Sequence, residues 1–316
     1  MILPNPVDLR DFLRYPLTLT LVFLNLFIFV LIFSGGQNSL SESGLLQDEK
    51  LVLSGRLYYQ YLKELPAAAL YEKPAWIHEL HTDSADQMLI LGSYALRDAD
   101  FLNKAEEFSY HGDEIQIAAW KKDVHVFREK YQEQLLFRFG LSSLEKGPLS
   151  WLTYQFSHSS WIHLLSNLLF LVVIGAAVES LAGSSVLLWV YVLGGVMGGV
   201  GFLLSQKAGT IPMVGASASI SALLAFYCAA ETRPRIRYFY FVSPLPNHHG
   251  FIYLPTLLIV PLFLLVDLAN FWSIPEGLGG GVAYAAHLGG TVFGLFAGII
   301  YRLVIRPEIK NSPIDL

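Results

Sequence analysis

The apolar residues of this chain gather into six long runs, with polar or charged stretches between them. Most runs approach the roughly 20 residues that an α-helix needs to cross the hydrocarbon core of a bilayer. The fourth run is shorter and begins near a serine, which favours a helix that starts partway into the membrane behind a loop lining a wet cavity. The pattern predicts an all-α, polytopic membrane protein with transmembrane helices at 17–34, 162–182, 184–205, 214–230, 252–272 and 283–304.

Composition agrees with this class, because 53% of the residues are hydrophobic and 15% are charged. The first run is longer than the core of a signal peptide and no A-x-A-like cleavage site follows it, so we expect a retained helix. Cys228 is the single cysteine, which excludes an intramolecular disulfide.

Lysine and arginine predict the orientation, since the cytoplasmic loops of membrane proteins are enriched in both. If the six helices alternate, three basic groups fall on one side: Arg10 with Arg14, Arg233 with Arg235 and Arg237, and Arg302 with Arg306 and Lys310. Both termini are then cytoplasmic. We expect a multi-pass protein of a bacterial plasma membrane whose partners are lipid and other membrane proteins, with no nucleic acid, metal or cofactor.

Between the first and second runs lies a mixed-charge region of soluble type, which predicts four parts: 1–36, 37–148, 149–304 and 305–316. Within the second part we expect helices over about 46–62, 86–101 and 113–137, the middle one interrupted by Gly92. The last has an apolar stripe that includes Trp120, Val124 and Phe127. The pair His78 and His81 lacks the spacing of a zinc-binding H-E-x-x-H motif, so a solvated face is the better interpretation.

Ser217 and His287 are the first candidates for chemistry. Ser217 follows a glycine-containing turn and opens an apolar run, where the unpaired N–H groups of a helix start could bind a developing oxyanion. His287 opens the last apolar run, and an ionisable side chain at that depth is costly. Glycines at 290 and 294 would let this helix pack on the small residues after Ser217 and bring the two side chains within reach. Either residue alone would more often be structural than catalytic.

A second polar cluster opens the 162–182 helix. His163 and Asn167 share one helical face at i, i+4 spacing, and His158 precedes them at the membrane edge. A neutral imidazole and an amide are donors suited to an oxyanion.

These residues form three motifs: H-x-x-x-x-H-x-x-x-N, G-x-S, and A-H-x-x-G-x-x-x-G, ending at Gly294. Together they resemble the rhomboid intramembrane serine proteases. The resemblance implies a six-helix bundle with a large, mainly helical extracytoplasmic insertion after the first helix. It also implies a serine endopeptidase that cleaves transmembrane or juxtamembrane segments, with Ser217 as nucleophile and His287 as base. The oxyanion would be held by the backbone of Ser217 and by His163 and Asn167, with His158 shaping and hydrating the pocket.

The sequence departs from the family at two places. Ala218 replaces the usual glycine after the serine, and Leu149-Ser150 stand where a Trp-Arg pair is common. Three further polar residues lie in or beside the apolar runs. Glu179 is expected to be a structural hydrogen-bond partner, Asp267 an interface or gating contact with a smaller chance of orienting His287, and Ser219 a packing residue.

Two rival functions remain open. A catalytically silent rhomboid-like protein that binds membrane clients would usually lack the serine or the histidine. A transporter would show repeated hydropathy halves with broken helices at corresponding places, and no such symmetry is visible.

Overall fold

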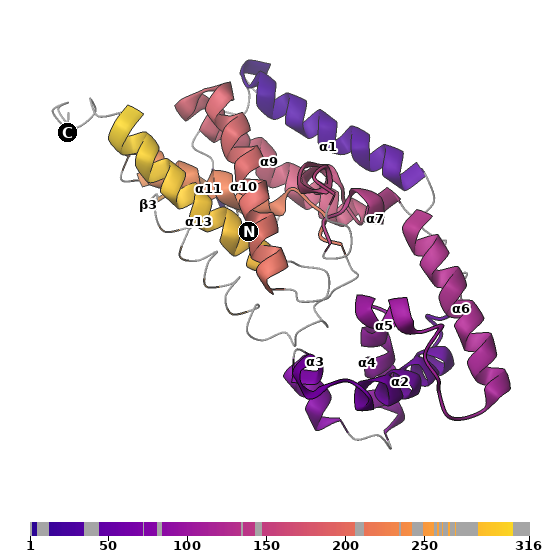
Figure 1. Cartoon of the computed structure of the whole chain (residues 1–316). Helices are drawn as coiled ribbons and strands as arrows, with labels where there is room; N and C mark the ends of the chain where they lie inside the picture. Colours follow the sequence, from indigo (N-terminus) through magenta and orange to yellow (C-terminus); the bar gives the residue numbers. More distant parts are fainter. Residues whose placement is uncertain are drawn as a thin grey trace, which may run out of the picture.

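The computed structural model of the chain is mostly helical, with a bundle of apolar helices and a second helical region (Figure 1). The structure describes residues 2–4, 13–34, 44–71, 73–80, 84–133, 135–142, 147–205, 212–233, 235–241, 249–255 and 284–305, with single positions at 258, 261, 265 and 269.

Within these residues, four helices are long and apolar enough to cross a membrane. They are α1 (Pro16–Ser34), α9 (Trp161–Ala182), α10 (Ser184–Ser205) and α13 (Tyr284–Ile300), which a π-helical turn, η6 (Tyr301–Ile305), continues. Helix α11 (Ser217–Ala230) is also apolar but has only 14 residues. These elements confirm five of the six predicted runs as helices. The remaining run, the fifth in chain order, was predicted at 252–272; most of it, including Asp267, lies outside the described residues.

Small residues allow α11 to pack closely against both α10 and α13. Gly290 and Gly294 of α13 lie directly on the backbone of Ala218 and Ala222, and Gly198 of α10 meets the methyl group of Ala218. A Cβ atom at any of these glycines would overlap the neighbouring helix. The predicted packing of the last helix on the small face of the fourth is therefore confirmed.

Glu179, near the C-terminal end of α9, joins that end to two other helices. Its carboxylate accepts hydrogen bonds from the N–H groups of Leu17 (3.0 Å) and Thr18 (2.9 Å), and from the hydroxyls of Thr18 and Ser184 (2.7 Å each). Leu17 and Thr18 begin α1, where N–H groups lack partners within the helix. The predicted structural role of Glu179 is confirmed.

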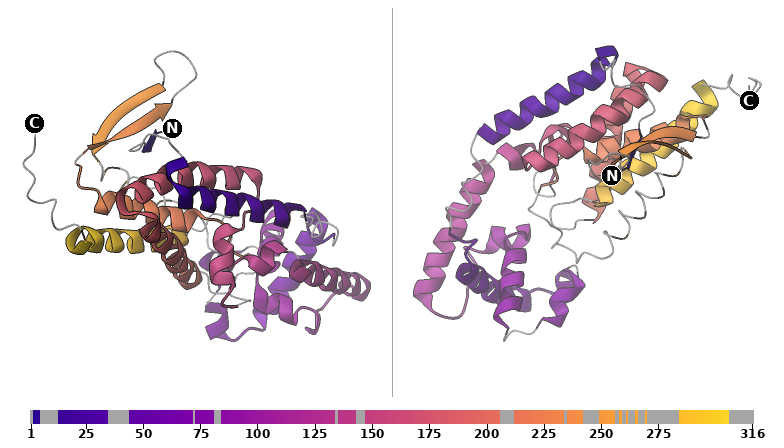
Figure 2. Two further views of the ribbon diagram at one scale, coloured as in Figure 1. Left: turned by 90° about the horizontal axis from the view of Figure 1, so that it is seen from above. Right: turned by 180° about the vertical axis from the view of Figure 1, so that it is seen from behind.

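A three-stranded antiparallel sheet corrects the all-α prediction. Strands β1 (Ile2–Pro4), β2 (Arg235–Phe241) and β3 (His249–Pro255) pair in that order, and the β2–β3 hairpin projects from the bundle (Figure 2). Ile252 and Leu254 pack on the apolar core of the bundle, whereas Tyr253 is exposed. The stretch 252–255 resembled the start of a transmembrane run because both faces of this strand carry large apolar or aromatic side chains.

The region between α1 and the rest of the bundle has an apolar core of its own, in which Tyr58, Leu91, Phe101 and Trp120 are fully buried. Burial of Trp120, Val124 and Phe127 confirms the predicted stripe. The helices of this region are α2 (Asp48–Lys63), α3 (Ala67–Tyr71), η3 (Ala75–Glu79), α4 (Ala85–Ala95), α5 (Ala99–Lys104), α6 (Glu114–Glu133) and α7 (Leu135–Phe139).

The single helix predicted over 86–101 is wrong, because the structure has two helices, α4 and α5, with a break between them. The carboxylate of Asp98 accepts hydrogen bonds from the N–H groups of Asp100 (3.1 Å) and Phe101 (3.3 Å), which starts α5 anew. Gly92 does not interrupt α4. Its backbone lies on the backbone of Leu51 in α2, at a crossing that leaves no room for a Cβ atom.

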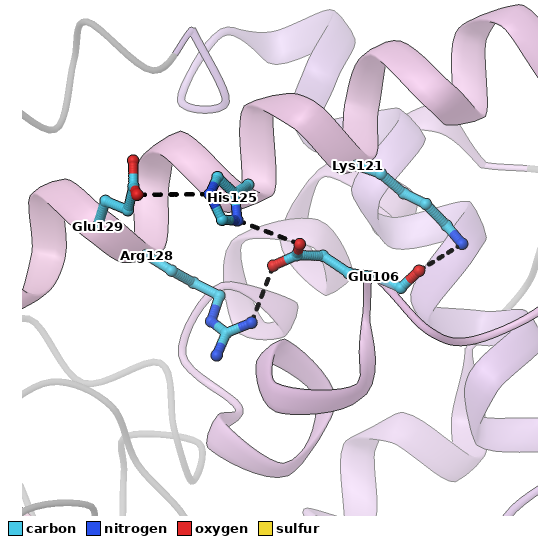
Figure 3. A network of polar contacts seen from close by, with 5 residues as sticks. All are labelled: Glu106, Lys121, His125, Arg128 and Glu129. Atoms are coloured by element: carbon cyan, nitrogen blue, oxygen red, sulfur yellow. Dashed lines mark hydrogen bonds and ion pairs between the residues drawn. The ribbon is translucent and has the colours of Figure 1, made fainter.

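Polar contacts join α6 to the segment that follows α5 (Figure 3). The Glu106 carboxylate accepts a hydrogen bond from Arg128 (2.9 Å) and lies 3.2 Å from Nδ1 of His125, and Lys121 donates to the Glu106 carbonyl (2.7 Å). His125 also lies 3.4 Å from a carboxylate oxygen of Glu129. These groups are partly exposed, so each contact adds little stability by itself, but together they define how α6 lies on the core.

Candidate active site

Ser217 is the first residue of α11 and follows a tight turn. Gly215, two residues earlier, has a φ of 119°, which L side chains rarely adopt. The N–H of Gly215 donates to the Tyr154 carbonyl (2.9 Å), and Met213 exchanges two backbone hydrogen bonds with Leu141. Ser217 is partly exposed. It stands where the N–H groups of a helix start lack partners within the helix and can bind a negatively charged oxygen.

His287 lies in the first turn of α13 and is partly buried. One turn further on, Gly290 rests on the carbonyl of Ala218, the residue after Ser217. The ring of Tyr284 meets the imidazole edge-on, with centroids 6.2 Å apart. Close packing of the two helices thus sets Ser217 and His287 on adjacent first turns. A hydrogen bond between their side chains stays a prediction.

His163 and Asn167, on the first turns of α9, lie against the turn that precedes Ser217. A Cβ atom on Gly215 would be 2.7 Å from Nε2 of His163 and 3.5 Å from Nδ2 of Asn167. The hydroxyl of Ser159 lies 3.2 Å from Nδ1 of His163, which leaves Nε2 on the side of Gly215.

His158 and Asn167 contain buried polar atoms that the protein does not satisfy. His158 is fully buried and its ring meets that of His163 edge-on, with centroids 5.1 Å apart. It lies near the backbone of Phe156, but neither ring nitrogen forms a hydrogen bond of good geometry with the described residues, and neither does Nδ2 of Asn167. Buried polar groups are nearly always paired. These atoms are therefore candidates to bind a substrate oxygen or water.

Burial, reinforced by the neighbouring His163, lowers the pKa of His158 to about 3 from its ordinary value of 6.5. His158 is therefore neutral at physiological pH, and it can act as a hydrogen-bond partner but not as a cation.

The lowered pKa of His158 predicts how the free energy of unfolding depends on pH. Between pH 6.5 and about 3 the unfolded chain binds a proton at His158 and the native chain does not, so stability falls as the pH falls, by at most about 1.4 kcal/mol per pH unit. His158→Gln should flatten the dependence of the melting temperature on pH in this window. His78→Gln, at an exposed histidine, is the control. Equal slopes for wild type and His158→Gln would contradict the prediction.

Residues 146–303 match the rhomboid domain family. The chain belongs to the rhomboid family. No curated protein matches it in sequence. The match extends from just before α8 (Ser150–Thr153) into η6, so it contains all five predicted site residues and leaves α1 and most of the inserted region outside. With its apolar helices, this rhomboid is an integral membrane protein.

In this rhomboid, His163 and Asn167 come together beside Gly215, and His158 lies against the ring of His163. Ser219, in contrast, is fully buried and donates a hydrogen bond to Oε1 of Gln155 (3.1 Å). The interpretation of Ser219 as a packing residue is thus confirmed. Asp267 and His81 lie outside the described residues. Among those described, no three histidine, cysteine, aspartate or glutamate side chains converge as metal ligands would.

Sequence reasoning missed Tyr154 and Gln155, which form the 3₁₀ turn η4 (Tyr154–Phe156) just before His158. Both are fully buried, and both bond to the loop or helix that carries Ser217. The available signal was a glutamine between two aromatic residues, four positions after Trp151, in a segment leading into an apolar helix.

Proposed function

We propose that this rhomboid is an intramembrane serine endopeptidase that cleaves transmembrane or juxtamembrane segments of other membrane proteins. The observation that carries the proposal is the packing of Gly290 on Ala218, which sets the turns bearing Ser217 and His287 side by side. The family match and the buried, unsatisfied donors of α9 support the same chemistry.

In this mechanism the hydroxyl of Ser217 attacks the carbonyl carbon of the peptide bond while His287 takes its proton. The tetrahedral intermediate collapses as His287 gives that proton to the leaving amine. Water then attacks the acyl-enzyme with His287 as base, which releases the acid product and restores the serine.

The developing oxyanion would be held by the N–H of Ser217, Nδ2 of Asn167 and Nε2 of His163. The last two atoms lie beside Gly215, and Nδ2 has no partner among the described residues. Donors aimed in advance at the developing charge lower the barrier because they need no reorganisation during the reaction. His158, buried next to His163, would shape and hydrate this pocket.

The proposed setting is a bacterial plasma membrane with both chain termini in the cytoplasm and the 37–148 region outside. Substrates would enter from the lipid near the outer leaflet. Helix-breaking or small residues near the cut are expected, because the substrate must present an extended segment to the serine. The inserted region would recruit substrates or control their access.

Labelling with a fluorophosphonate probe tests the proposal on the purified full-length protein. Wild type should be labelled, Ser217→Ala should not, and Ser221→Ala, one turn along the same helix, should be labelled like wild type. Failure of the folded wild type to react would instead favour the silent, client-binding alternative.

Asn167→Ala is expected to lower kcat about 100- to 1,000-fold without abolishing cleavage, since one oxyanion donor contributes about 2.7–4 kcal/mol. The measurement is cleavage of a fluorescent transmembrane substrate in proteoliposomes. Thr18→Val removes a buried hydroxyl of α1 that bonds to Glu179, near the opposite end of α9 from Asn167, and is the control. A kcat within about threefold of wild type would remove Asn167 from the proposed oxyanion site.

Gly215→Ala is expected to lower kcat on the order of 100-fold, because the new methyl group would displace His163 and the turn before Ser217. Gly183→Ala is a matched control, since Gly183 also has positive φ (84°) but open space around it. If both variants lose activity equally, backbone strain and not the contact with His163 is responsible.

A further inference from the structure

We propose that Gln155 is a positioning residue that holds the first turn of α11, and with it Ser217, at a set place relative to α9. The proposal rests on the function proposed above and extends it to a side chain outside the predicted site. Gln155 lies in η4, three residues before His158, and is fully buried.

The side chain of Gln155 forms three hydrogen bonds that join η4 to three other elements. Its Nε2 donates to the carbonyls of Trp151 in α8 (3.0 Å) and Val192 in α10 (3.3 Å), and its Oε1 accepts from Ser219 in α11 (3.1 Å). Its backbone carbonyl accepts from the hydroxyl of Tyr191 (3.2 Å). A planar amide held by three hydrogen bonds at full burial has little freedom to move.

The bonds from η4 reach α11 on both sides of the nucleophile. The carbonyl of Tyr154 binds the N–H of Gly215, two residues before Ser217, and the amide of Gln155 binds the hydroxyl of Ser219, two residues after it. The segment that leads to His158 therefore holds the backbone on either side of Ser217. A shift of this segment would move the nucleophile relative to His163 and Asn167.

The hydrogen bonds of Gln155 require α10 to lie very close to η4. Gly195 of α10 lies against the amide group of Gln155, and a Cβ atom there would overlap it. The hydroxyl of Tyr154 donates to the Gly195 carbonyl. The tetrahedral intermediate forms only if the reacting groups are positioned to within fractions of an ångström. Loss of the hydrogen bonds of Gln155 should therefore lower kcat more than it weakens substrate binding.

A double-mutant cycle tests the inference with the full-length protein. Gln155→Met and Ser219→Ala each leave a buried polar group without its partner, whereas the double variant removes both groups. We expect each single variant and the double to lower kcat by a similar factor, about tenfold, with KM within about twofold of wild type. The melting temperature should fall in the single variants and recover in part in the double.

The outcomes of these experiments distinguish failure of the inference about Gln155 from failure of the proposed protease function. If kcat recovers together with the melting temperature in the double variant, or stays at the wild-type value in the singles, Gln155 only stabilises the fold and the inference is overturned. Thr18→Val, which removes one buried hydrogen bond to Glu179 near the opposite end of α9, should lower the melting temperature without changing kcat. Wild type that neither cleaves nor reacts with the fluorophosphonate would overturn the proposed function and this inference together.

Discussion

Ser217→Ala is expected to lower cleavage of a membrane-embedded substrate by at least about 1,000-fold, because no other group at this position can form the acyl-enzyme. His287→Ala should lower it by a similar factor, since a serine hydroxyl without a base is a poor nucleophile. The double variant should be no slower than either single one, because nucleophile and base act as a unit.

The measurement is the rate of appearance of the cleaved fragment in proteoliposomes, normalised to the amount of folded protein. Ser221→Ala controls for loss of a hydroxyl on the same helix. Two losses that multiply in the double variant would show that Ser217 and His287 act separately, contrary to the dyad. A Ser217→Ala protein with more than about a tenth of the wild-type rate would place the nucleophile elsewhere.

Asp98→Ala is expected to destabilise the inserted region by about 3–5 kcal/mol, the usual result of removing one partner of a buried ion pair. Asp98 is 1% exposed, and its carboxylate accepts hydrogen bonds from Lys73 and Tyr58 as well as from the first N–H groups of α5. The substitution leaves the buried Lys73 ammonium without its counter-ion and removes the cap of α5. Burial, reinforced by the same carboxylate, raises the pKa of Tyr58, which therefore remains a neutral donor.

Hydrogen exchange of the full-length protein, read over α2, α4 and α5, measures the effect. Asp123→Ala is the matched control, because Asp123 forms an ion pair with Lys50 (2.8 Å) in which both side chains are about one-third exposed. Such a pair contributes at most about 1 kcal/mol. Equal changes in exchange for the two variants would mean that the Lys73–Asp98 pair does not stabilise this core.

Much of the candidate site could be predicted because its signals are local. The i, i+4 pair His163 and Asn167, the glycine-containing turn before Ser217 and the small residues around His287 each depend on a few neighbouring positions. The packing of Gly290 on Ala218 followed from their size alone, since only small residues let membrane helices approach so closely.

Other features could not be predicted because their partners lie far away in sequence. The role proposed for Gln155 depends on its hydrogen bonds with Val192 and Ser219, 37 and 64 positions later. The strands β2 and β3 depend on mutual backbone pairing, and their composition is equally compatible with the start of an apolar helix. The Asp98 carboxylate, which caps α5 locally, is also bonded by Lys73 and Tyr58, 25 and 40 positions earlier, and the sequence does not reveal these partners.

The amino-acid sequence by itself determined most of the apolar helices, the polar groups of the candidate site and the family. Runs of apolar residues partition into a bilayer whatever their neighbours are, and motif spacing places side chains on one helical face. Only the tertiary structure decided which buried polar groups find partners, where the sheet forms and how η4 holds α11. Those outcomes depend on hydrogen bonds and close contacts between segments that meet only when the chain is folded.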